Sequence, residues 1–291
     1  MLRPDPSMFL SPAKVNLCLN VLGKRPDGYH DIFSIMQPVD LYDEISIEVS
    51  EGEGISLVCD NPQVPSDKTN LAHKAAALFF KETGMKYKTH INIKKKIPVS
   101  AGLGGGSSNA AAVLIGLNRI MDTVLGEERM LKMASILGSD VPFFILKSSA
   151  IVTGRGELVE RIDIPLYWYV IVNPGFEVST AWTYNNLNLT KKSPGIRLSY
   201  SKNKLEERFK IEDLLLNDLE KVVLRAYPKL RKLKGLLSKV GAEGVLMSGS
   251  GPTVFGLFFK EEKARDAFDK LNRSLKGGVA IFLTRGIEDG P

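Results

Sequence analysis

The sequence predicts an enzyme-like α+β protein of two domains. Its 291 residues suit two domains better than one. Strand-like stretches, in which apolar and polar residues alternate, and helix-like stretches, with an apolar residue every three or four positions, occur in both halves. Because these patterns weaken between residues 154 and 164, we predict domains over residues 1–158 and 159–291.

Periodicity assigns the elements of each half. In the first half we expect strands over residues 9–22, 45–49, 55–59, 89–97 and 141–146, and helices over residues 70–81, 109–121 and 127–137. In the second half we expect strands over residues 168–172, 244–247, 253–259 and 279–285, helices over residues 179–187, 206–240 and 263–275, and a polar loop over residues 191–203.

The composition is that of a protein with a buried core and no membrane segment. Apolar residues make up 44% and charged residues 25% of the sequence. No apolar stretch approaches the ~18–20 residues of a membrane helix, and the first residues lack the pattern of a secretory signal. Cys18 and Cys59 are too few for a disulfide framework, and we expect both to be buried small side chains. A cytoplasmic location is expected.

The net charge of +6 does not decide the function. It fits an anionic small substrate, a nucleic acid or neither. The densest basic run is Lys94–Lys95–Lys96, which lacks the interleaved aromatic residues of a single-strand binding surface. The simpler interpretation is a solvated strand edge, which lysines protect from aggregation.

The run PVSAGLGGGSSNAAAV, residues 98–113, is the most informative stretch. A flexible linker is excluded because the run lies between a predicted strand and an alanine-rich predicted helix. The dinucleotide fingerprint G-x-G-x-x-G fails, since Ser107 stands at the third glycine position. The Walker A pattern fails because no Lys-Ser or Lys-Thr follows the glycines.

Two interpretations of the glycine run remain. Glycines allow close backbone approach and positive φ, and a helix start offers unpaired N–H groups to an anion. Ser107 and Ser108 add hydroxyl groups. A phosphate-binding loop is favoured, and a tight turn with helix-packing glycines is the alternative.

Three further stretches carry polar residues at informative places. In SPAKVNLCL, Lys14 and Asn16 share one face of a predicted strand. In GSDVPFF, Asp140 follows a predicted helix, next to a proline that we expect to halt helical structure. SGSGPTVFG is a second glycine-rich turn, at residues 248–256. Taken singly, these are interpreted as a surface lysine, a turn or cap residue and a hairpin.

In this order and spacing the four motifs resemble those of the GHMP kinases. Residues 98–108 match the phosphate-loop pattern of that family, with one extra glycine. The stretches SPAKVNLCLNVLGKRPDGYHD, GLGGGSSNAA, LGSDVPFF and SGSGPTVFGLF are most similar to the branch that acts on a CDP-linked methylerythritol. The resemblance extends from about residue 9 to residue 285 and is weakest over residues 191–234.

The resemblance implies a two-domain fold. Its N-terminal domain would be an α/β domain like ribosomal protein S5, and its C-terminal domain would be a ferredoxin-like α+β domain. The active site would lie in the cleft between them. The implied reaction transfers the γ-phosphoryl group of ATP to the 2-hydroxyl of the methylerythritol unit, in the non-mevalonate route to isoprenoids.

The resemblance also assigns residues to the site. Lys14 and Asp140 match the catalytic pair, in which Asp140 would accept or orient the substrate hydroxyl and Lys14 would hold Asp140 ionised. Asn70 and Lys95 match positions that flank adenine. The ATP loop corresponds to Pro98, Val99, Ser100, Ala101, Gly102, Leu103, Gly104, Gly105, Gly106, Ser107 and Ser108. ATP brings Mg²⁺, for which the sequence identifies no ligand.

For the cytidine end of the substrate, the resemblance assigns mainly aromatic residues. Tyr29 and His30 match residues that recognise the pyrimidine, and Tyr184 matches an aromatic that stacks on it, with Trp182 as a nearby competitor. Asn16 matches a polar contact to the substrate. We expect no nucleic-acid or membrane partner, and a monomer or a weak dimer.

The runner-up hypotheses are a GHMP kinase for mevalonate or homoserine and, remotely, a basic nucleic-acid-binding protein.

Overall fold

The computed structural model describes residues 6–123, 125–188 and 214–288. Its strands are β1 (Ser7–Lys24), β2 (His30–Ser50), β3 (Gly54–Cys59), β4 (Lys88–Lys94), β5 (Ala150–Thr153), β6 (Leu158–Arg161), β7 (Trp168–Asn173), β8 (Leu216–Asn217), β9 (Gly244–Met247), β10 (Val254–Phe258) and β11 (Ala280–Arg285). Its helices are α1 (Leu71–Thr83), α2 (Gly105–Ile120), α3 (Glu127–Leu137), α4 (Val141–Leu146), α5 (Thr180–Asn185), α8 (Glu220–Ala226), α9 (Lys229–Lys239) and α10 (Glu261–Ser274).

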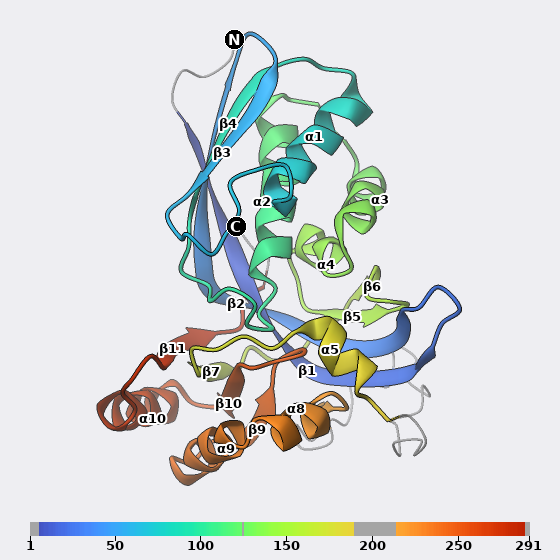
Figure 1. Cartoon of the computed structure of the whole chain (residues 1–291). Helices are drawn as coiled ribbons and strands as arrows, with labels where there is room; N and C mark the ends of the chain where they lie inside the picture. The colour runs from blue at the N-terminus through green and yellow to red at the C-terminus, as the bar shows by residue number, and fades with distance from the viewer. Residues whose placement is uncertain (1–5, 124, 189–213, 289–291) are drawn as a thin grey trace.

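The larger sheet is built on two long antiparallel strands, β1 and β2. Across the described residues it has seven strands in the order β3-β4-β2-β1-β8, with β5 paired to β2 and β6 to β5. The β1–β2 register runs from Ser7 opposite Ile47 to Lys24 opposite His30. In Figure 1 these two strands extend from the part that carries α1–α4 into the part that carries α8–α10. They therefore connect the two halves of the molecule.

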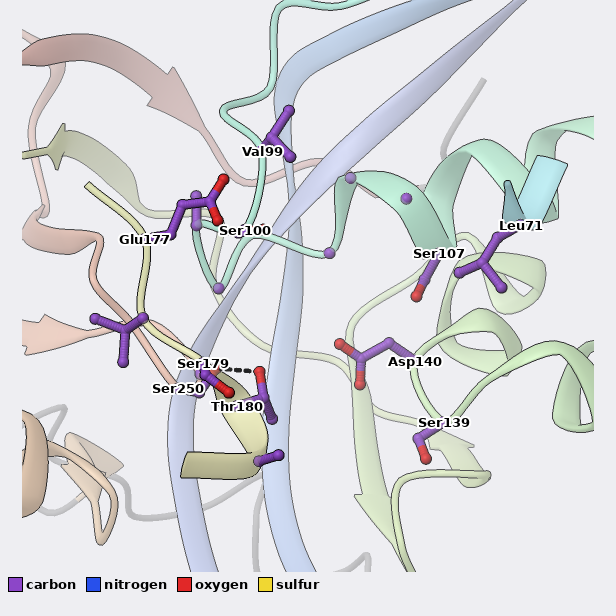
Figure 2. Close-up of a pocket in the computed structure, with 18 of the residues that line it drawn as sticks. Leu71, Val99, Ser100, Ser107, Ser139, Asp140, Glu177, Ser179, Thr180 and Ser250 are labelled. Carbon is purple, nitrogen blue, oxygen red and sulfur yellow. Dashed lines mark hydrogen bonds between the residues drawn. The ribbon is translucent and has the colours of Figure 1, made fainter. Parts of the chain in front are cut away.

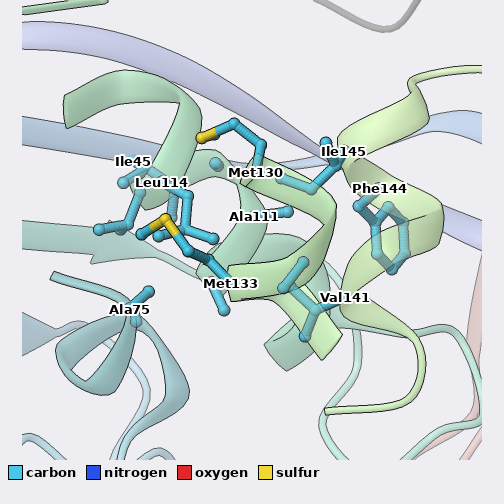
Figure 3. Packing of buried hydrophobic residues seen from close by; sticks show 14 of the residues in the cluster. Ile45, Ala75, Ala111, Leu114, Met130, Met133, Val141, Phe144 and Ile145 are labelled. Atoms are coloured by element: carbon cyan, nitrogen blue, oxygen red, sulfur yellow. The ribbon is translucent and has the colours of Figure 1, made fainter. Parts of the chain in front are cut away.

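Helices α1–α4 cover one face of this sheet (Figure 1). Figure 3 shows the core between them, where Leu114 of α2 and Met130 and Met133 of α3 pack with Ile45 of β2. Gly116 lets α2 approach the sheet closely, because a Cβ there would lie 2.7 Å from Cδ1 of Ile47. Burial of these apolar side chains is what fixes α2, and hence the loop before it, against the sheet.

The smaller sheet has the order β11-β7-β10-β9 in the described part of the chain. Helices α9 and α10 pack on it through residues at helical spacing. Those buried residues are Leu230, Leu233 and Leu237 of α9 and Ala264, Ala267 and Leu271 of α10. The boundary predicted after residue 158 stays a prediction; β6 crosses that point, and the smaller sheet begins at Trp168.

Most predicted elements are confirmed, but residues 141–146 form a helix and not a strand. All six side chains of α4 are buried, and a short apolar run has the same pattern in a buried strand and a buried helix. The proline expected to stop helical structure, Pro142, instead lies in the first turn of α4, where its missing N–H is tolerated. The helix expected from residue 109 begins at Gly105.

The second half contains two further differences. The predicted loop over residues 191–203 and the start of the helix predicted over 206–240 lie outside the described residues. The remainder of that helix is divided into β8, α8 and α9, with Pro228 directly before α9. A proline is favoured at a helix start and disfavoured inside one, which accounts for the break.

The basic run and one cysteine also differ from expectation. Strand β4 lies between β3 and β2, so the basic run does not belong to an edge strand, although the side chains of Lys94 and Lys96 are solvated as expected. The side chain of Lys95 is only 4% exposed. Cys18 is buried, whereas Cys59 is half-buried. Across the described residues, no helix combines the length and the apolar character needed to cross a membrane.

Candidate active site

A cavity of about 970 Å³ lies where the two halves meet. Its walls come from β1, the loop before α2, the segment between α3 and α4, the start of α5 and the turn between β9 and β10. Figure 2 shows Ser107 and Asp140 on one side of it and Glu177, Thr180 and Ser250 on the other. Segments from β1 to the β9–β10 turn, far apart in the sequence, thus meet at one cavity.

Nearly all of the predicted site residues line this cavity. They are Lys14, Asn16, Tyr29, His30, Asn70, Lys95, Pro98, Val99, Ser100, Ala101, Gly102, Gly104, Gly105, Gly106, Ser107, Asp140 and Tyr184. Leu103 and Ser108 are not among the described residues that line it. Leu103 packs into the apolar core, and the Ser108 hydroxyl accepts a hydrogen bond from Ser11 at 2.7 Å. These two residues support the loop from behind.

The glycine loop adopts a conformation that side chains would prevent. Gly102 and Gly104 have φ of +75° and +73°. A Cβ on Gly102 would lie 2.2 Å from the carbonyl oxygen of Ser248, so the loop touches the turn between β9 and β10. That turn also donates a hydrogen bond, from Ser248 Oγ to the Gly102 carbonyl at 2.9 Å. The two glycine-rich motifs therefore fix each other's position.

Helix α2 starts directly at the cavity. Its N-cap is Gly104, which has no side chain to cap the first turn. The N–H groups of the first turn of a helix lack intrahelical partners and carry the positive end of the helix dipole. Gly105, Gly106 and Ser107 line the cavity at this point. The arrangement suits a bound phosphate group.

Lys14 is the central cation of the site. Its side chain is 4% exposed, and its ammonium donates to Asn16 Oδ1 and lies 3.7 Å from Asp140 Oδ2. Burial lowers the pKa of Lys14, and the negative charge of Asp140 opposes that shift. Asn16 is held in turn by donating from Nδ2 to Ser34 Oγ at 2.9 Å. The Lys14 ammonium is thus oriented by two side chains, that of Asn16 on β1 and that of Asp140 between α3 and α4.

Asp140 presents its carboxylate to the cavity because it does not cap the helix that it precedes. It occupies the N-cap position of α4, but its side chain makes no capping hydrogen bond to the described residues. Its side chain is 32% exposed, and Figure 2 shows it on the same side of the cavity as Ser107. The expectation of a cap or turn residue describes its position correctly but not its contacts.

The end of the cavity near β2 is aromatic. The rings of His30 and Tyr184 stack with centroids 5.0 Å apart and an interplanar angle of 27°. Burial, followed by the charge of Lys24, lowers the pKa of His30, which favours the neutral imidazole. Tyr29 is 53% exposed. Trp182 packs edge-on against Tyr227, with ring centroids 6.0 Å apart. Tyr184 is thus the aromatic of α5 that lines the cavity.

The opposite end of the cavity is formed by Asn70 and Lys95. Asn70 caps α1, since its Oδ1 accepts from the Ala72 N–H at 2.8 Å, and its Nδ2 donates to the Pro65 carbonyl at 2.7 Å. The ammonium of Lys95 pairs with the buried carboxylate of Asp43. Both predicted residues line the cavity while holding its wall in shape.

Several cavity residues were not predicted from the sequence. Arg155 lies with its guanidinium 5.2 Å from the ring centroid of Tyr29. The hydroxyl groups of Thr180 and Ser250 form a hydrogen bond of 2.8 Å, which connects the start of α5 to the β9–β10 turn. Arg155 follows one glycine and precedes another, a weak signal for a functional turn. The Thr180–Ser250 contact has no sequence signal because the two residues are distant in the chain.

A resident metal centre is not indicated within the described parts of the chain, which contain no group of three or more histidine, cysteine, aspartate and glutamate side chains suited to a metal. A nucleotide-bound Mg²⁺ needs only one or two protein oxygen ligands beside the phosphates. The Ser107 hydroxyl lines the cavity at the start of α2 and is an oxygen donor of that kind.

Two family comparisons agree with this architecture. Residues 70–148 match the GHMP kinases N terminal domain, and residues 204–277 match the GHMP kinases C terminal family. The first match contains the glycine loop and Asp140, and the second contains the β9–β10 turn. The fold and the site thus define a kinase of the GHMP class.

Individual relatives narrow the assignment. A protein from Syntrophotalea carbinolica named 4-diphosphocytidyl-2-C-methyl-D-erythritol kinase is 44% identical over 282 residues, 97% of this chain and 99% of the relative. A crystal structure of a 4-(cytidine 5'-diphospho)-2C-methyl-D-erythritol kinase matches with a TM-score of 0.80 at 33% identity, covering 97% of this chain and all of the other. The chain belongs to the 4-diphosphocytidyl-2-C-methyl-D-erythritol kinase family.

A more distant match shows the fold alone. The mevalonate kinase of Methanococcus jannaschii has a TM-score of 0.71 at 18% identity, over 98% of this chain and 100% of the other. The predicted GHMP kinase fold is therefore confirmed. The runner-up hypothesis of a mevalonate-type kinase is not favoured, because identity to the 4-diphosphocytidyl-2-C-methyl-D-erythritol kinase named above is much higher.

Proposed function

We propose that the chain transfers the γ-phosphoryl group of ATP to the 2-hydroxyl of 4-(cytidine 5'-diphospho)-2-C-methyl-D-erythritol, giving the 2-phosphate and ADP. The proposal rests above all on the Lys14–Asp140 pair at 3.7 Å, which lies in one cavity with a glycine loop and with an aromatic pair. The relatives' names supply the substrate, and the cavity offers chemically matching groups at each end.

Asp140 would act on the acceptor hydroxyl. As the hydroxyl oxygen bonds to the γ-phosphorus and the bond to the ADP oxygen breaks, the hydroxyl proton moves to the Asp140 carboxylate. The Lys14 ammonium keeps that carboxylate ionised and stabilises negative charge on the transferring group. Asn16 orients Lys14, and its position beside the pair suits a contact to the acceptor.

The glycine loop would bind the donor. The N–H groups at the start of α2 and the hydroxyl of Ser107 would hold the ATP phosphates, with Asn70 and Lys95 near the adenine. Mg²⁺ arrives with ATP as part of the donor, where it offsets phosphate charge. The cation that a Walker loop carries in its own sequence would here come from Lys14 of β1.

Tyr29, His30 and Tyr184 would bind the cytidine. The stacked rings of His30 and Tyr184 offer a flat surface for a pyrimidine, and a neutral imidazole can both donate and accept a hydrogen bond. Tyr29 is exposed at the same end, where it can close over the base. The cytoplasmic location and the oligomeric state remain predictions.

Asp140→Asn tests the proposed chemistry. The amide cannot accept the proton, so kcat should fall by at least about 10²-fold, the usual contribution of a general base. Affinity for ATP should change by less than about threefold, which isothermal titration would measure. The matched control is Asp122→Asn on an exposed turn, which should keep wild-type turnover. Retained turnover in Asp140→Asn would refute the role.

Tyr29→Ala and His30→Ala test the acceptor site. Loss of one base-stacking partner should weaken the CDP-linked substrate by about 5- to 100-fold, while ATP affinity stays within twofold. His90→Ala is the control, since His90 instead pairs with Ser56 at 2.9 Å on β3. Equal losses for both ligands would mean that Tyr29 and His30 do not bind cytidine.

A further inference from the structure

Asp43 of β2 is a fully buried carboxylate that the proposed chemistry does not use. Four hydrogen bonds from described residues reach its two oxygens. Oδ1 accepts from the N–H groups of Lys96 and Ile97 at 2.8 and 2.9 Å. Oδ2 accepts from the Lys95 ammonium and from Asn109 Nδ2, the latter at 2.8 Å. Each carboxylate oxygen thus accepts two hydrogen bonds, so this buried side chain is fully satisfied by its neighbours.

The donors lie on both sides of the glycine loop. Lys95, Lys96 and Ile97 lead into it, and Asn109 is in the first turns of α2 behind it. Asp43 thus joins the two ends of the loop through one side chain on the sheet. This contact follows from the β2–β4 register, in which Glu44 opposite Lys94 brings Asp43 beside the chain that leaves β4.

The same network continues to the serine behind the loop. Asn109 Nδ2 also donates to Ser11 Oγ at 2.9 Å, and Ser11 Oγ donates to Ser108 Oγ at 2.7 Å. Ser11, Asp43, Ser108 and Asn109 are all buried. Satisfied buried polar networks hold their members in one arrangement, since breaking one bond leaves an unpaired group away from water.

Lys95 connects this network to the cavity wall. Its side chain is 4% exposed, and a Cβ on Gly105 would lie 3.0 Å from its Nζ. The ammonium therefore lies immediately beside the first residue of α2. Without the Asp43 carboxylate, this buried ammonium would lack its partner and would move toward solvent. That movement would shift the N-terminal turn of α2.

We propose that Asp43 is a positioning residue for the phosphate-binding loop. Through Lys95 and Asn109 it fixes the start of α2, so the affinity for ATP depends on a carboxylate that is not among the described residues lining the cavity. The inference rests on the proposed binding of ATP phosphates by the glycine loop. It adds a residue that the loop motif itself does not contain.

The test compares Asp43→Asn with Glu44→Gln. Glu44 is the next carboxylate along β2 and pairs with Lys96 at 2.8 Å, but it is partly exposed and points away from the network. Binding of a non-hydrolysable ATP analogue and of the CDP-linked substrate is measured by isothermal titration for each variant. Asp43→Asn should weaken the ATP analogue by at least about tenfold and the CDP-linked substrate by less than threefold. Glu44→Gln should leave both within twofold.

A second variant covers the case in which Asp43→Asn does not fold. Ser11→Ala removes one hydroxyl of the network, keeps the Asp43–Lys95 pair and should weaken the ATP analogue by about two- to tenfold, with the CDP-linked substrate unchanged. If the variants that fold lose both ligands equally, or lose neither, Asp43 is a structural residue and the inference is wrong.

The same titrations separate this inference from the proposed function. Binding of the ATP analogue needs no acceptor. A wild-type protein that binds the analogue but does not phosphorylate the CDP-linked alcohol would refute the proposed acceptor and leave the role of Asp43 standing. A wild-type protein that does not bind the analogue would overturn both.

Discussion

Replacing Gly102 by alanine should both destabilise the protein and disturb the glycine loop. Gly102 has φ of +75°, where an L-residue costs about 1–2 kcal/mol. Its new Cβ would lie 2.2 Å from the Ser248 carbonyl oxygen and close to the backbone of Gly251. Backbone atoms cannot rotate away, so overpacking adds about 1–3 kcal/mol. The free energy of unfolding should therefore fall by about 2–5 kcal/mol.

Gly106→Ala is the matched control within the same loop. Apart from its chain neighbours and the backbone of its own helix, no atom of the described residues lies within 4 Å of a Cβ built on Gly106, which belongs to the first turn of α2. Alanine in a helix is more favourable than glycine by about 0.5–1 kcal/mol, so this variant should be as stable as the wild type or more stable. Urea unfolding followed by circular dichroism measures both changes. A Gly102→Ala variant within about 0.5 kcal/mol of the wild type would refute the close contact between the two turns.

The remaining predictions concern Lys14 and the two cysteines. Burial lowers the pKa of Lys14 below its ordinary 10.5, so kcat should fall on the alkaline side at a pH below 10.5, as the ammonium loses its proton. A pH–kcat profile with circular dichroism at each pH checks this, and a profile that stays flat to pH 10.5 would contradict it. In the same alkaline range the unfolded chain binds more protons than the folded one, so the Lys14 contribution to stability rises with pH. Cys18 is buried, and burial raises the pKa of its thiol to about 12. Cys59 is only half-buried. A thiol reagent should modify Cys59 in the native protein and Cys18 only after denaturation; modification of Cys18 in the folded chain would be the contrary result.

The sequence was sufficient to predict the helices and strands whose apolar residues recur at a clear period. The helix predicted over residues 127–137 is α3, and the strand predicted over 168–172 is β7 with one more residue. The period failed at residues 141–146, because a six-residue run that is apolar throughout has no face to distinguish a strand from a helix.

The candidate site was predictable where a motif carried it. The glycine loop, Lys14 and Asp140 each lie in a recognisable stretch, and the fold brings all three to one cavity. Contacts between distant segments had no such signal. The partnership of Asp43 with Lys95 depends on the β2–β4 register, and a lysine within a basic run gives no indication that it is buried.

Lys95 illustrates what a motif cannot specify. The resemblance predicts it beside the adenine, and it does line the cavity, yet its ammonium is engaged with Asp43. Whether its stem contacts the nucleotide stays a prediction. The physical reason is that a position in a motif fixes the residue type, whereas the direction of a long side chain is set by the charges around it.

The most direct test of the account is a coupled assay of ADP release with a panel of alcohols. The purified chain, ATP and Mg²⁺ are combined with the CDP-linked methylerythritol, with mevalonate or with homoserine, and the phosphorylated product is located by ³¹P NMR. We expect ADP release only with the CDP-linked substrate, and a phosphate on its 2-hydroxyl. ADP release that is equally fast with mevalonate or homoserine, or a phosphate on another oxygen, would contradict it.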